Sequence, residues 1–383
     1  MRFKQVLGNK KIKNQLISSV ENNRIAHAHL FSGESGGSKL ITAIAFAQYI
    51  NCKNKLKEDS CGECPSCKKY KNLTHPDLHL IFPVLTNSKI KKPTSDNYIT
   101  EFREEVLKNP YLTLNNWFDI FSKDNKAGKK GYIYIQEIAS LHNKMLLKTY
   151  ESEYRVVILW MPEYMQLSTS NKMLKILEDP PEKTIFILVS EKPQNLLSTI
   201  ISRLQITNMT HNTQNEKEEI IRNQNIVDED EIKNILNINN GNLGDTIFVL
   251  NNDIKEENYL EEFKTWMRHC YAMRFQELIQ WTNERSQKGR MDQSRFLEYS
   301  LKIIRMCLIY NYSNTNIINP TEKEIAFLSK FHTFINKNNI TEITKRIESS
   351  IRDIERNANP KITIFELSLQ LIKLLKLNRK LAV

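Results

Sequence analysis

The sequence contains no hydrophobic run long enough to cross a membrane. None of its apolar stretches approaches the roughly 20 residues that a membrane-spanning helix requires. The opening residues, Met1 to Gln5, also lack the apolar core of a secretory signal peptide. We therefore expect a cytoplasmic protein with no segment in the membrane.

Acidic residues are too few to balance the basic ones. The chain has 55 Lys and Arg against 44 Asp and Glu, a formal net charge of +11 at pH 7. This charge permits contact with nucleic acid but does not establish it, because lysines are scattered along the chain. A solvated basic surface is the preferred interpretation. At 383 residues and 40% hydrophobic content, the chain is an ordinary globular protein with room for two or three domains.

Cysteine is also scarce, with six residues, yet four of them are clustered with the spacing C-x8-C-x2-C-x2-C. Four thiolates at this spacing can converge on one tetrahedral ion, and they leave no open position for catalysis. Gly62 and Pro65 favour the tight turns that such a site requires. We predict a closed, structural Zn²⁺ site formed by Cys52, Cys61, Cys64 and Cys67.

Other interpretations of the cysteines stay open. Disulfides are disfavoured because cytoplasmic thiols remain reduced, whereas an iron–sulfur cluster is possible. His75 and His79 are the nearby alternative ligands. Cys270 and Cys307 fall in helical patterns far along the chain, and we predict that they are ordinary buried thiols.

Strands and a helix alternate between Arg155 and Arg203. Val156 to Leu159 is an apolar run typical of a strand buried on both faces. A helix is expected from Ser168 to about Leu177, because Pro180-Pro181 cannot continue it. A second apolar strand follows at Ile185 to Val189. This succession predicts part of a parallel sheet.

A loop with phosphate-binding spacing follows a predicted strand at His27 to Gly33. A working loop reads G-x-x-x-x-G-K-[ST], in which the Lys neutralises the phosphates and the Ser or Thr binds Mg²⁺. Here Gly33 and Lys39 are present, but Ser38 replaces the last glycine and Leu40 replaces the Mg²⁺ ligand. Because leucine cannot coordinate a metal, the spacing is retained without the chemistry.

The second half of an ATPase site is missing as well. Such a site needs acidic residues at the end of the strand at 156–159, where they hold Mg²⁺ and orient the attacking water. This chain has Trp160 and Met161 there, and Glu163 comes later. We therefore expect no ATP hydrolysis by this chain. Weak nucleotide binding through Lys39 stays open, as does a role of Lys39 as a surface lysine at a helix end.

These motifs resemble the clamp-loader branch of the AAA+ ATPases. Asn171 to Pro181 is similar to the family's N-x-L-L-K-x-L-E-E-P-P block, and Ser202-Arg203 stands where the family has Ser-Arg-Cys. Further family motifs are matched at Val6 to Asn9, His27 to Gly33 and His75 to Asp77. The resemblance covers roughly residues 1–250.

The resemblance implies an α/β fold with a P-loop NTPase-like parallel sheet, an inserted zinc module, a small helical lid and an all-α collar domain. We accordingly expect the AAA+-like domain at 1–209, the lid at 210–252 and the C-terminal collar, an oligomerisation domain, at 253–383. Within the first domain, the zinc module is expected at about 51–68 and an insertion at about 86–131. The insertion is interpreted as a basic surface excursion, with a DNA or partner contact as the alternative.

Several other elements are expected from the pattern of apolar residues. Phe3 to Val20 predicts an amphipathic helix, and Leu78 to Val84 predicts a strand. In the collar, inward-facing positions are predicted from helical spacing at Phe263, Trp266, Met267, Phe275, Leu278 and Ile279.

The resemblance also implies an inactive nucleotide site. Glu163 fits the A-[DE]-x-M pattern that non-hydrolysing members carry in place of the acidic pair. Gly244 stands where active members have the lid arginine that senses the γ-phosphate. Gly33 and Lys39 are then the remains of a phosphate loop that is expected to be empty, so ATP is not expected as a cofactor. Zn²⁺ is expected, because the matching module of the family binds zinc.

Ser202 and Arg203 imply a role in the site of another subunit. In the family, this arginine projects in trans into a neighbouring ATPase site as an arginine finger; a structural ion pair is the alternative. The resemblance implies a component of the DNA polymerase III holoenzyme, a nucleotidyltransferase complex. Its partners would be gamma/tau ATPase and delta subunits in a hetero-oligomeric ring, which helps load the sliding clamp onto primer-template DNA.

Two other functions stay open. An active ATPase subunit of the gamma/tau type would need Mg²⁺ ligands that Leu40, Trp160 and Met161 cannot supply. A zinc-dependent nucleic-acid-binding protein would need base-stacking aromatics around the cysteines, where only Tyr70 is close.

Overall fold

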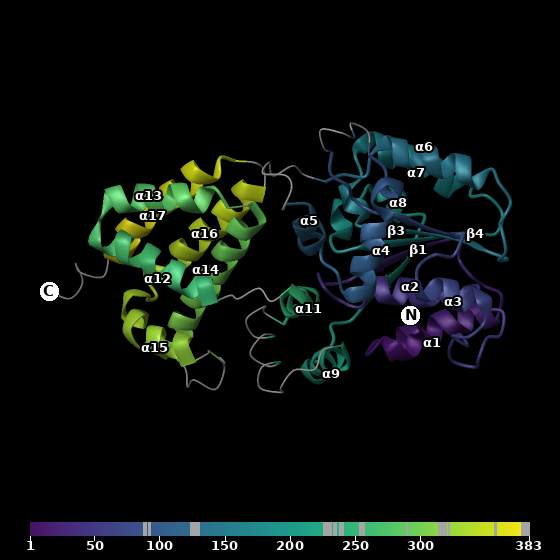
Figure 1. Ribbon diagram of the computed structural model, residues 1–383, viewed down its shortest axis with the longest axis horizontal. Coiled ribbons are helices and arrows are strands. Elements are labelled where there is room, and N and C mark those ends of the chain that lie inside the picture. The colour runs from purple at the N-terminus through teal and green to yellow at the C-terminus, as the bar shows by residue number, and fades with distance from the viewer. Residues whose placement is uncertain are drawn as a thin grey trace. The chain divides into compact units, whose positions relative to one another are not determined.

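The computed structural model describes residues 1–86, 90, 93–122, 131–224, 232, 236, 241–252, 257–288, 290–312, 320, 322–355 and 358–376. These residues group into two compact units (Figure 1). The first unit holds nearly all described residues up to Asn252, and the second holds those from Glu257 onward.

The first unit is built on a parallel sheet of five strands in the order β2-β3-β4-β1-β5. The strands are β1 (Ala28–Ser32), β2 (Leu78–Ile81), β3 (Arg155–Trp160), β4 (Thr184–Ser190) and β5 (Gln205–Asn208). Every residue of β3 and β4 is buried, as their continuous apolar runs predict. The two strands pair from Arg155 opposite Thr184 to Trp160 opposite Val189.

Helices cover both faces of the sheet (Figure 1). One face packs against α6 (Ile135–Met145), α7 (Leu167–Glu178) and α8 (Ser198–Ile201). The other face contacts α2 (Lys39–Ile50), which in turn contacts α1 (Lys10–Glu21) and α3 (Pro65–Lys71). All residues of α2 are buried, because it lies between the sheet and these outer helices. The predicted α/β fold is confirmed.

Two predicted elements differ at their ends. The expected helix from Phe3 to Val20 is split into a 3₁₀ turn, η1 (Phe3–Gln5), and α1. The split occurs because Gly8 and Asn9 adopt positive φ angles of 72° and 50°, which a helix cannot accommodate. Strand β2 ends at Ile81 rather than at Val84, since Pro83 has no N–H to donate to a neighbouring strand.

The insertion is part of the core rather than a surface excursion over residues 93–122. It forms the 3₁₀ turn η2 (Ser95–Tyr98) and helices α4 (Ile99–Lys108) and α5 (Leu114–Ser122). The ring of Phe102 stacks on Phe82 at 3.9 Å and lies 5.1 Å from that of Trp117. Trp117 also donates its indole N–H to the carbonyl of Pro83 at 2.8 Å. The basic stretches at 87–89, 91–92 and 123–130 lie outside the described residues.

The predicted lid contributes α9 (Gln214–Gln224) and α11 (Leu243–Asn252), which group with the sheet in the first unit. Residues 225–231, 233–235 and 237–240 of the predicted lid lie outside the described residues. The boundary between sheet and lid therefore stays a prediction.

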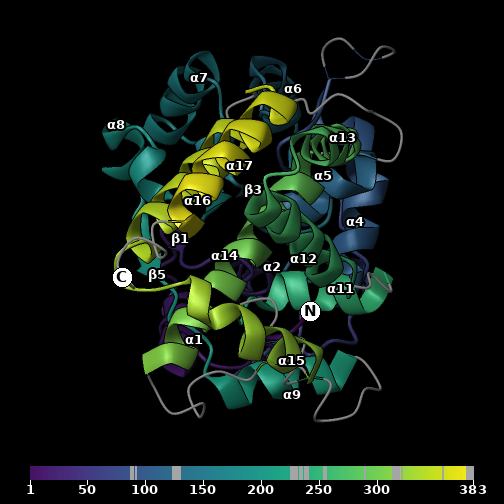
Figure 2. The same ribbon diagram turned by 90° about the vertical axis from the view of Figure 1, so that its left-hand side faces the viewer.

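The second unit is helical in its described part, as predicted. Its helices are α12 (Glu257–Ala272), α13 (Phe275–Ser286), α14 (Arg290–Tyr312), α15 (Glu322–Phe331), α16 (Ile340–Glu355) and α17 (Pro360–Lys376). Helices α16 and α17 run side by side (Figure 2). In the core of this unit, Trp266 stacks on Trp281 at 5.4 Å and donates its indole N–H to Ser368 Oγ at 2.8 Å.

Four of the six predicted inward positions of the collar are buried, and two are exposed. Phe275 and Ile279 face solvent, because Leu278 and Trp281 form the packed side of α13. Cys270 and Cys307 are buried thiols, as predicted, and burial raises the pKa of each to about 12. Within the described part of the chain, none of the helices has the length and apolarity that a bilayer span demands.

The packing of the insertion predicts an unequal effect of two substitutions in α4. Phe102→Ala removes a fully buried ring and should lower the free energy of unfolding by about 3–5 kcal/mol. Leu107→Ala, in the same helix but exposed, should change it by no more than about 0.5 kcal/mol. Urea unfolding followed by circular dichroism measures both. Equal, small effects would show that the insertion contributes nothing to the core.

Candidate functional site

The degenerate phosphate loop lies between β1 and α2, where the sequence predicts it. Lys39 begins α2, but it is buried rather than a surface lysine. Its ammonium group donates a hydrogen bond to the backbone carbonyl of Glu34, within the same loop. Lys39 thus has a partner inside the chain at the position where a working loop directs its lysine to a phosphate.

Three carboxylates interact electrostatically with the buried ammonium group. Burial lowers the pKa of Lys39, and the nearby Glu191, Glu163 and Glu34 partly oppose this effect. Burial likewise raises the pKa of Glu191, with the charge of Lys39 acting against it. Side chains of this protein therefore offset part of the cost of burying the lysine charge. Sequence reasoning missed Glu191, although its place directly after the buried strand β4 could have indicated it.

Glu163 connects the turn after β3 with the loop after β4 through hydrogen bonds. It lies in the 3₁₀ turn η3 (Pro162–Tyr164) that follows β3. Its Oε1 accepts hydrogen bonds from the backbone N–H groups of Glu191 at 2.9 Å and Lys192 at 3.0 Å. The end of β3 itself carries Trp160 and Met161, both buried, and the ring of Trp160 lies 5.5 Å from that of Phe102. Apolar packing thus occupies the place of the acidic pair.

Residues of the insertion fill the space beside Gly244, the position of the missing lid arginine. Gly244 lies in the first turn of α11, where a Cβ would be only 2.1 Å from the carbonyl oxygen of Tyr111 and 2.8 Å from Thr113 Cγ2. The carbonyl of Gly244 accepts hydrogen bonds from the side-chain amides of Asn109 at 2.8 Å and Asn116 at 3.0 Å. No side chain fits here, so the glycine and the insertion depend on each other.

The phosphate loop also contacts the lid directly. Gly36 has a φ angle of +68°, and a Cβ on it would lie 2.0 Å from Asn242 Oδ1. The hydroxyl of Ser38 donates to Asn212 Oδ1 at 2.6 Å in a buried contact. The loop that would surround a nucleotide's phosphates is therefore packed against its own chain on the lid side.

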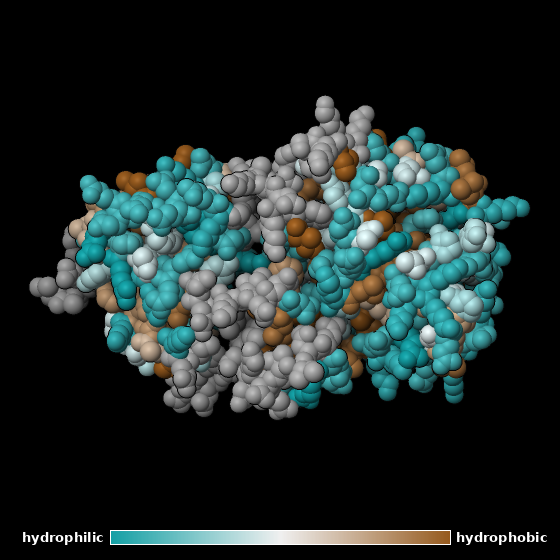
Figure 3. All heavy atoms as spheres, in the orientation of Figure 1, coloured by the Kyte–Doolittle hydropathy of each residue, from teal (hydrophilic) through white to brown (hydrophobic). Residues whose placement is uncertain are grey.

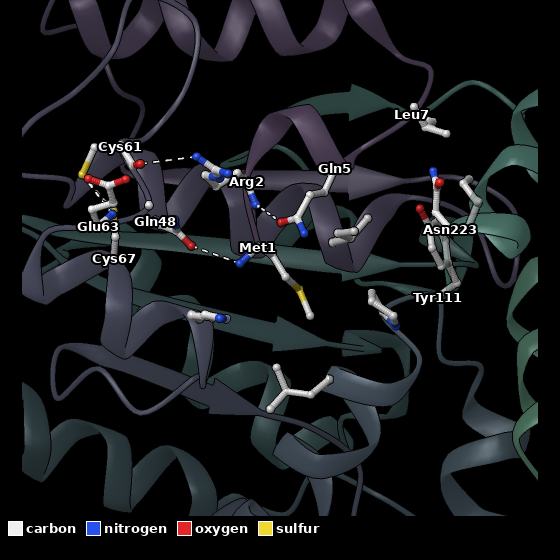
Figure 4. Close-up of a pocket in the computed structure, with 16 residues that line it drawn as sticks. Met1, Arg2, Gln5, Leu7, Gln48, Cys61, Glu63, Cys67, Tyr111 and Asn223 are labelled. Carbon is white, nitrogen blue, oxygen red and sulfur yellow. Dashed lines mark hydrogen bonds between the residues drawn. The ribbon is translucent and has the colours of Figure 1, made fainter. Parts of the chain in front are cut away.

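A cavity of about 660 Å³ is lined in part by Ile41 and Gln48 of α2 (Figure 4). Its polar groups are bonded to one another: the Met1 amine donates to Gln48 Oε1 at 3.1 Å, and Arg2 Nη1 donates to the carbonyl of Cys61 at 3.3 Å. Leu7 and Tyr111 form an apolar part of the cavity wall. The cavity thus joins the opening segment, the cysteine cluster and the insertion.

The four predicted cysteines converge, as their spacing indicates. Their sulfur atoms all lie within 4.8 Å of one another, and none is in a disulfide. Backbone N–H groups point at the sulfurs: Cys64 donates to Cys61 Sγ at 3.3 Å, and Cys67 donates to Cys64 Sγ at 3.4 Å. Such bonds stabilise thiolates. The group can hold one metal ion.

The turns of the cluster are those that the sequence predicts. Gly62 has a φ angle of +79°, and Pro65 is the first residue of α3. His75, an alternative ligand, is engaged elsewhere: its Nδ1 accepts from the N–H of Asp77 at 3.1 Å. Among the described residues, neither His75 nor His79 belongs to the group of ligands that could share an ion with the cysteines.

Arg203 follows α8 and forms an ion pair on the protein surface. Its Nη2 lies 2.6 Å from Glu178 Oε1, and its Nη1 donates to the carbonyl of Thr199 at 2.7 Å. The side chains of Arg203 and Glu178 are 35% and 51% exposed. Ser202 Oγ also donates to the Thr199 carbonyl, at 3.1 Å. Two sequence motifs that lie 25 residues apart therefore meet at this pair.

Leu204, which replaces the family cysteine and follows Arg203, is buried and packs with the apolar residues of α8. The ion pair itself is weak, because exposed pairs typically contribute about 0–1 kcal/mol. Arg203 can therefore exchange Glu178 for another anion at little cost.

The contact at Gly244 predicts a destabilising alanine. In a helix, Gly→Ala normally stabilises by about 1 kcal/mol, but here the new Cβ overlaps the Tyr111 carbonyl. Gly244→Ala should lower the free energy of unfolding by about 1–3 kcal/mol in urea titrations. Gly33→Ala, whose Cβ would lie 3.3 Å from its nearest neighbour, is the control and should cost less. An unchanged or higher stability of Gly244→Ala would contradict the packing.

Comparisons with known proteins place the first unit in a family. The model of the family described as "DNA polymerase III, delta subunit" matches residues 8–213, just over half of the chain. DNA polymerase III subunit delta' of Bacillus subtilis is 28% identical over 195 residues, which cover 51% of this chain and 45% of that protein. Subunit tau of the same organism is 28% identical over 204 residues, 53% of this chain and 28% of that protein.

A second delta' subunit and one solved structure are also similar to this chain. Subunit delta' of Yersinia pestis is 26% identical over 191 residues, 49% of this chain and 43% of that protein. A gamma subunit-related protein of DNA polymerase III from Thermotoga maritima has a solved structure that covers 95% of this chain and 99% of that chain. It shows 13% identity and a TM-score of 0.43. The chain spans less than half the length of the curated relatives that it matches. Through the match over residues 8–213, the chain belongs to the DNA polymerase III delta subunit family.

Proposed function

We propose that this chain acts as the delta'-type subunit of a DNA polymerase III clamp loader. In this role it would not hydrolyse ATP but would assemble with gamma/tau ATPase subunits and delta into a ring that loads the sliding clamp onto primed DNA. Matches to delta' and tau subunits support these partners. The observation that carries the proposal is an internally occupied phosphate loop on the same chain as an exposed arginine.

Three positions of this chain lack a group that ATP hydrolysis requires. Leu40 offers no Mg²⁺ ligand, and Trp160 places a buried ring where a carboxylate is needed. At the third position, Gly244 leaves no room for the arginine that would sense the γ-phosphate. Because each loss removes a different part of the chemistry, no single substitution restores the site.

Arg203 would contribute more in a neighbouring ATPase site than it contributes in its ion pair with Glu178. An arginine finger supplied in trans accelerates phosphoryl transfer by about 10³–10⁵, which corresponds to roughly 4–7 kcal/mol of barrier. The ion pair with Glu178 is worth no more than about 1 kcal/mol at its exposed position. The gain in a neighbour's site therefore exceeds the cost of leaving Glu178. Ser202 would shape the turn that presents Arg203.

The metal is proposed to be structural Zn²⁺ held by Cys52, Cys61, Cys64 and Cys67. Four thiolates suit zinc or an iron–sulfur cluster, and the zinc module of the clamp-loader family favours zinc. A four-cysteine site has no open position, so the ion would supply folding energy rather than catalysis. It would fix the segment around Gly62, where the carbonyl of Cys61 accepts a hydrogen bond from Arg2, against α3.

The alternative is an active gamma/tau-type ATPase subunit, but it is not favoured, because the match to tau covers 28% of that protein against 45% for delta'. The two functions differ in nucleotide chemistry. A delta'-type subunit changes the turnover of its partners, whereas a tau-type subunit hydrolyses ATP itself.

Substitution of the finger should slow the ATPase of the assembled loader. In a complex reconstituted from purified subunits, Arg203→Ala should reduce ATP turnover at the neighbouring site by at least tenfold. Arg24→Ala, which removes another exposed arginine of the first unit, is the control and should leave turnover unchanged. Both variants should keep the unfolding midpoint of the wild type. Equal turnover of the three complexes would refute the finger.

Metal analysis tests the cysteine site. The purified protein should carry one zinc per chain, and Cys67→Ser should lose it. Cys307→Ser, which alters a buried thiol of the second unit, should retain the metal. Plasma mass spectrometry gives both values. The zinc assignment would be contradicted if the purified protein contained iron with inorganic sulfide, or if it folded without any metal.

A further inference from the structure

Glu178 restrains the arginine that the proposed function assigns to another subunit's site. The face of the molecule in Figure 3 is mainly hydrophilic, with apolar residues in small separate areas, and a single exposed ion pair is ordinary on such a surface. The pair of Glu178 with Arg203 needs a further explanation, because a guanidinium nitrogen that is bonded to a carboxylate is not available to a phosphate.

The guanidinium group of Arg203 is bonded to three acceptors of its own chain. Its Nη2 donates to Glu178 Oε1 at 2.6 Å. Its Nη1 donates to the carbonyl of Thr199 at 2.7 Å and to Ser202 Oγ at 3.4 Å. Glu178 is the charged member of this set, and hydrogen bonds between two charged groups are the stronger kind. Glu178 is therefore the main competitor of any anion that approaches Arg203.

The backbone is fixed at both ends of the pair. Leu177, which precedes Glu178, and Leu204, which follows Arg203, are buried in the same apolar cluster. The backbone N–H of Arg203 also donates to the carbonyl of Ile200 at 3.0 Å. Because both backbones are anchored in one core, the pair can open by rotation of the two exposed side chains alone. Such rotations of exposed side chains take place within picoseconds to nanoseconds.

Glu178 contributes little to the helix that carries it. It is the last residue of α7, where the partial negative charge of a helix C-terminus disfavours a carboxylate. It has no other hydrogen bond or ion pair to any residue that the structure describes. The contact that a carboxylate gains at this position is thus the one with Arg203.

We propose that Glu178 is a positioning residue that holds Arg203 back from the neighbouring nucleotide until the γ-phosphate displaces the carboxylate. A carboxylate and a phosphate that approached one guanidinium group together would repel each other, so Arg203 engages one of them at a time. Glu178 touches neither the nucleotide nor the attacking water and acts only through Arg203. The inference rests on the proposed function, because it assumes that Arg203 reaches a γ-phosphate in trans.

The exposure of the pair limits the size of the effect. An ion pair of this kind shifts an equilibrium by a factor of up to about five. Competition from Glu178 lowers the population of free Arg203 by that factor, and the effective contribution of the finger falls with it. Removal of the carboxylate should therefore raise turnover at the neighbouring site, whereas removal of Arg203 lowers it. Opposite directions distinguish the two roles.

The test uses the loader reconstituted from full-length subunits. Glu178→Gln, which keeps the size of the side chain and removes its charge, should raise kcat for ATP by about two- to fivefold. The KM for ATP should stay unchanged, because a finger acts on the transition state. Glu153→Gln is the matched control: it breaks another exposed pair, with Lys183 at 3.3 Å, and should leave kcat unchanged. Both variants should unfold at the wild-type midpoint.

A double variant separates this role from a structural one. Because Glu178 acts through Arg203, Glu178→Gln/Arg203→Ala should turn over ATP at the rate of Arg203→Ala alone. A higher rate of the double variant, or a kcat of Glu178→Gln at or below that of the wild type, would overturn the inference. If Arg203→Ala slows turnover while Glu178→Gln has no effect, Glu178 does not restrain the finger and the proposed function stands. If Arg203→Ala has no effect, both fail.

Discussion

The contact between Gly244 and the insertion is the constraint on which the first unit depends. Two buried amides, from Asn109 and Asn116, donate to one backbone carbonyl of α11, and the carbonyl of Tyr111 occupies the space of a side chain there. The insertion is in turn held on the sheet by the stacked rings of Phe102 and Phe82. One continuous set of contacts therefore connects sheet, insertion and lid. In an active ATPase of this kind, the nucleotide itself would make such a connection.

The charges of Lys39 and Arg203 are also compensated by groups of the chain itself. In a working phosphate loop, the lysine charge is compensated by the phosphates of the nucleotide. Without a nucleotide, a buried lysine needs other groups to compensate its charge. Here the carbonyl of Glu34 accepts from Lys39, and Glu163 and Glu191 lie close by. Arg203 is in the reverse situation, because its exposed pair with Glu178 can open at little cost. Lys39 is therefore bonded within the chain, whereas Arg203 lies at the surface in a weak ion pair.

The sequence predicts the sheet because its signals are local. The apolar runs of β3 and β4, the break at Pro180-Pro181 and the cysteine spacing each follow from residues close together in the chain, and the structure has them in place. The prediction that the insertion is a surface excursion is wrong, because its few buried residues, such as Phe102 and Trp117, are separated by polar ones in the sequence. Their partners Phe82 and Trp160 lie far away in sequence. The burial of Lys39 and the role of Glu191 likewise depend on tertiary neighbours that no local pattern contains.

The central claim is that this chain has replaced a nucleotide with its own side chains while it keeps an arginine for another subunit's nucleotide. The most direct test is ATP hydrolysis by the isolated, purified chain in the presence of Mg²⁺. The account predicts no turnover above that of buffer, and no difference between the wild type and Lys39→Ala. Mg²⁺-dependent turnover by the wild type that Lys39→Ala abolishes would contradict it.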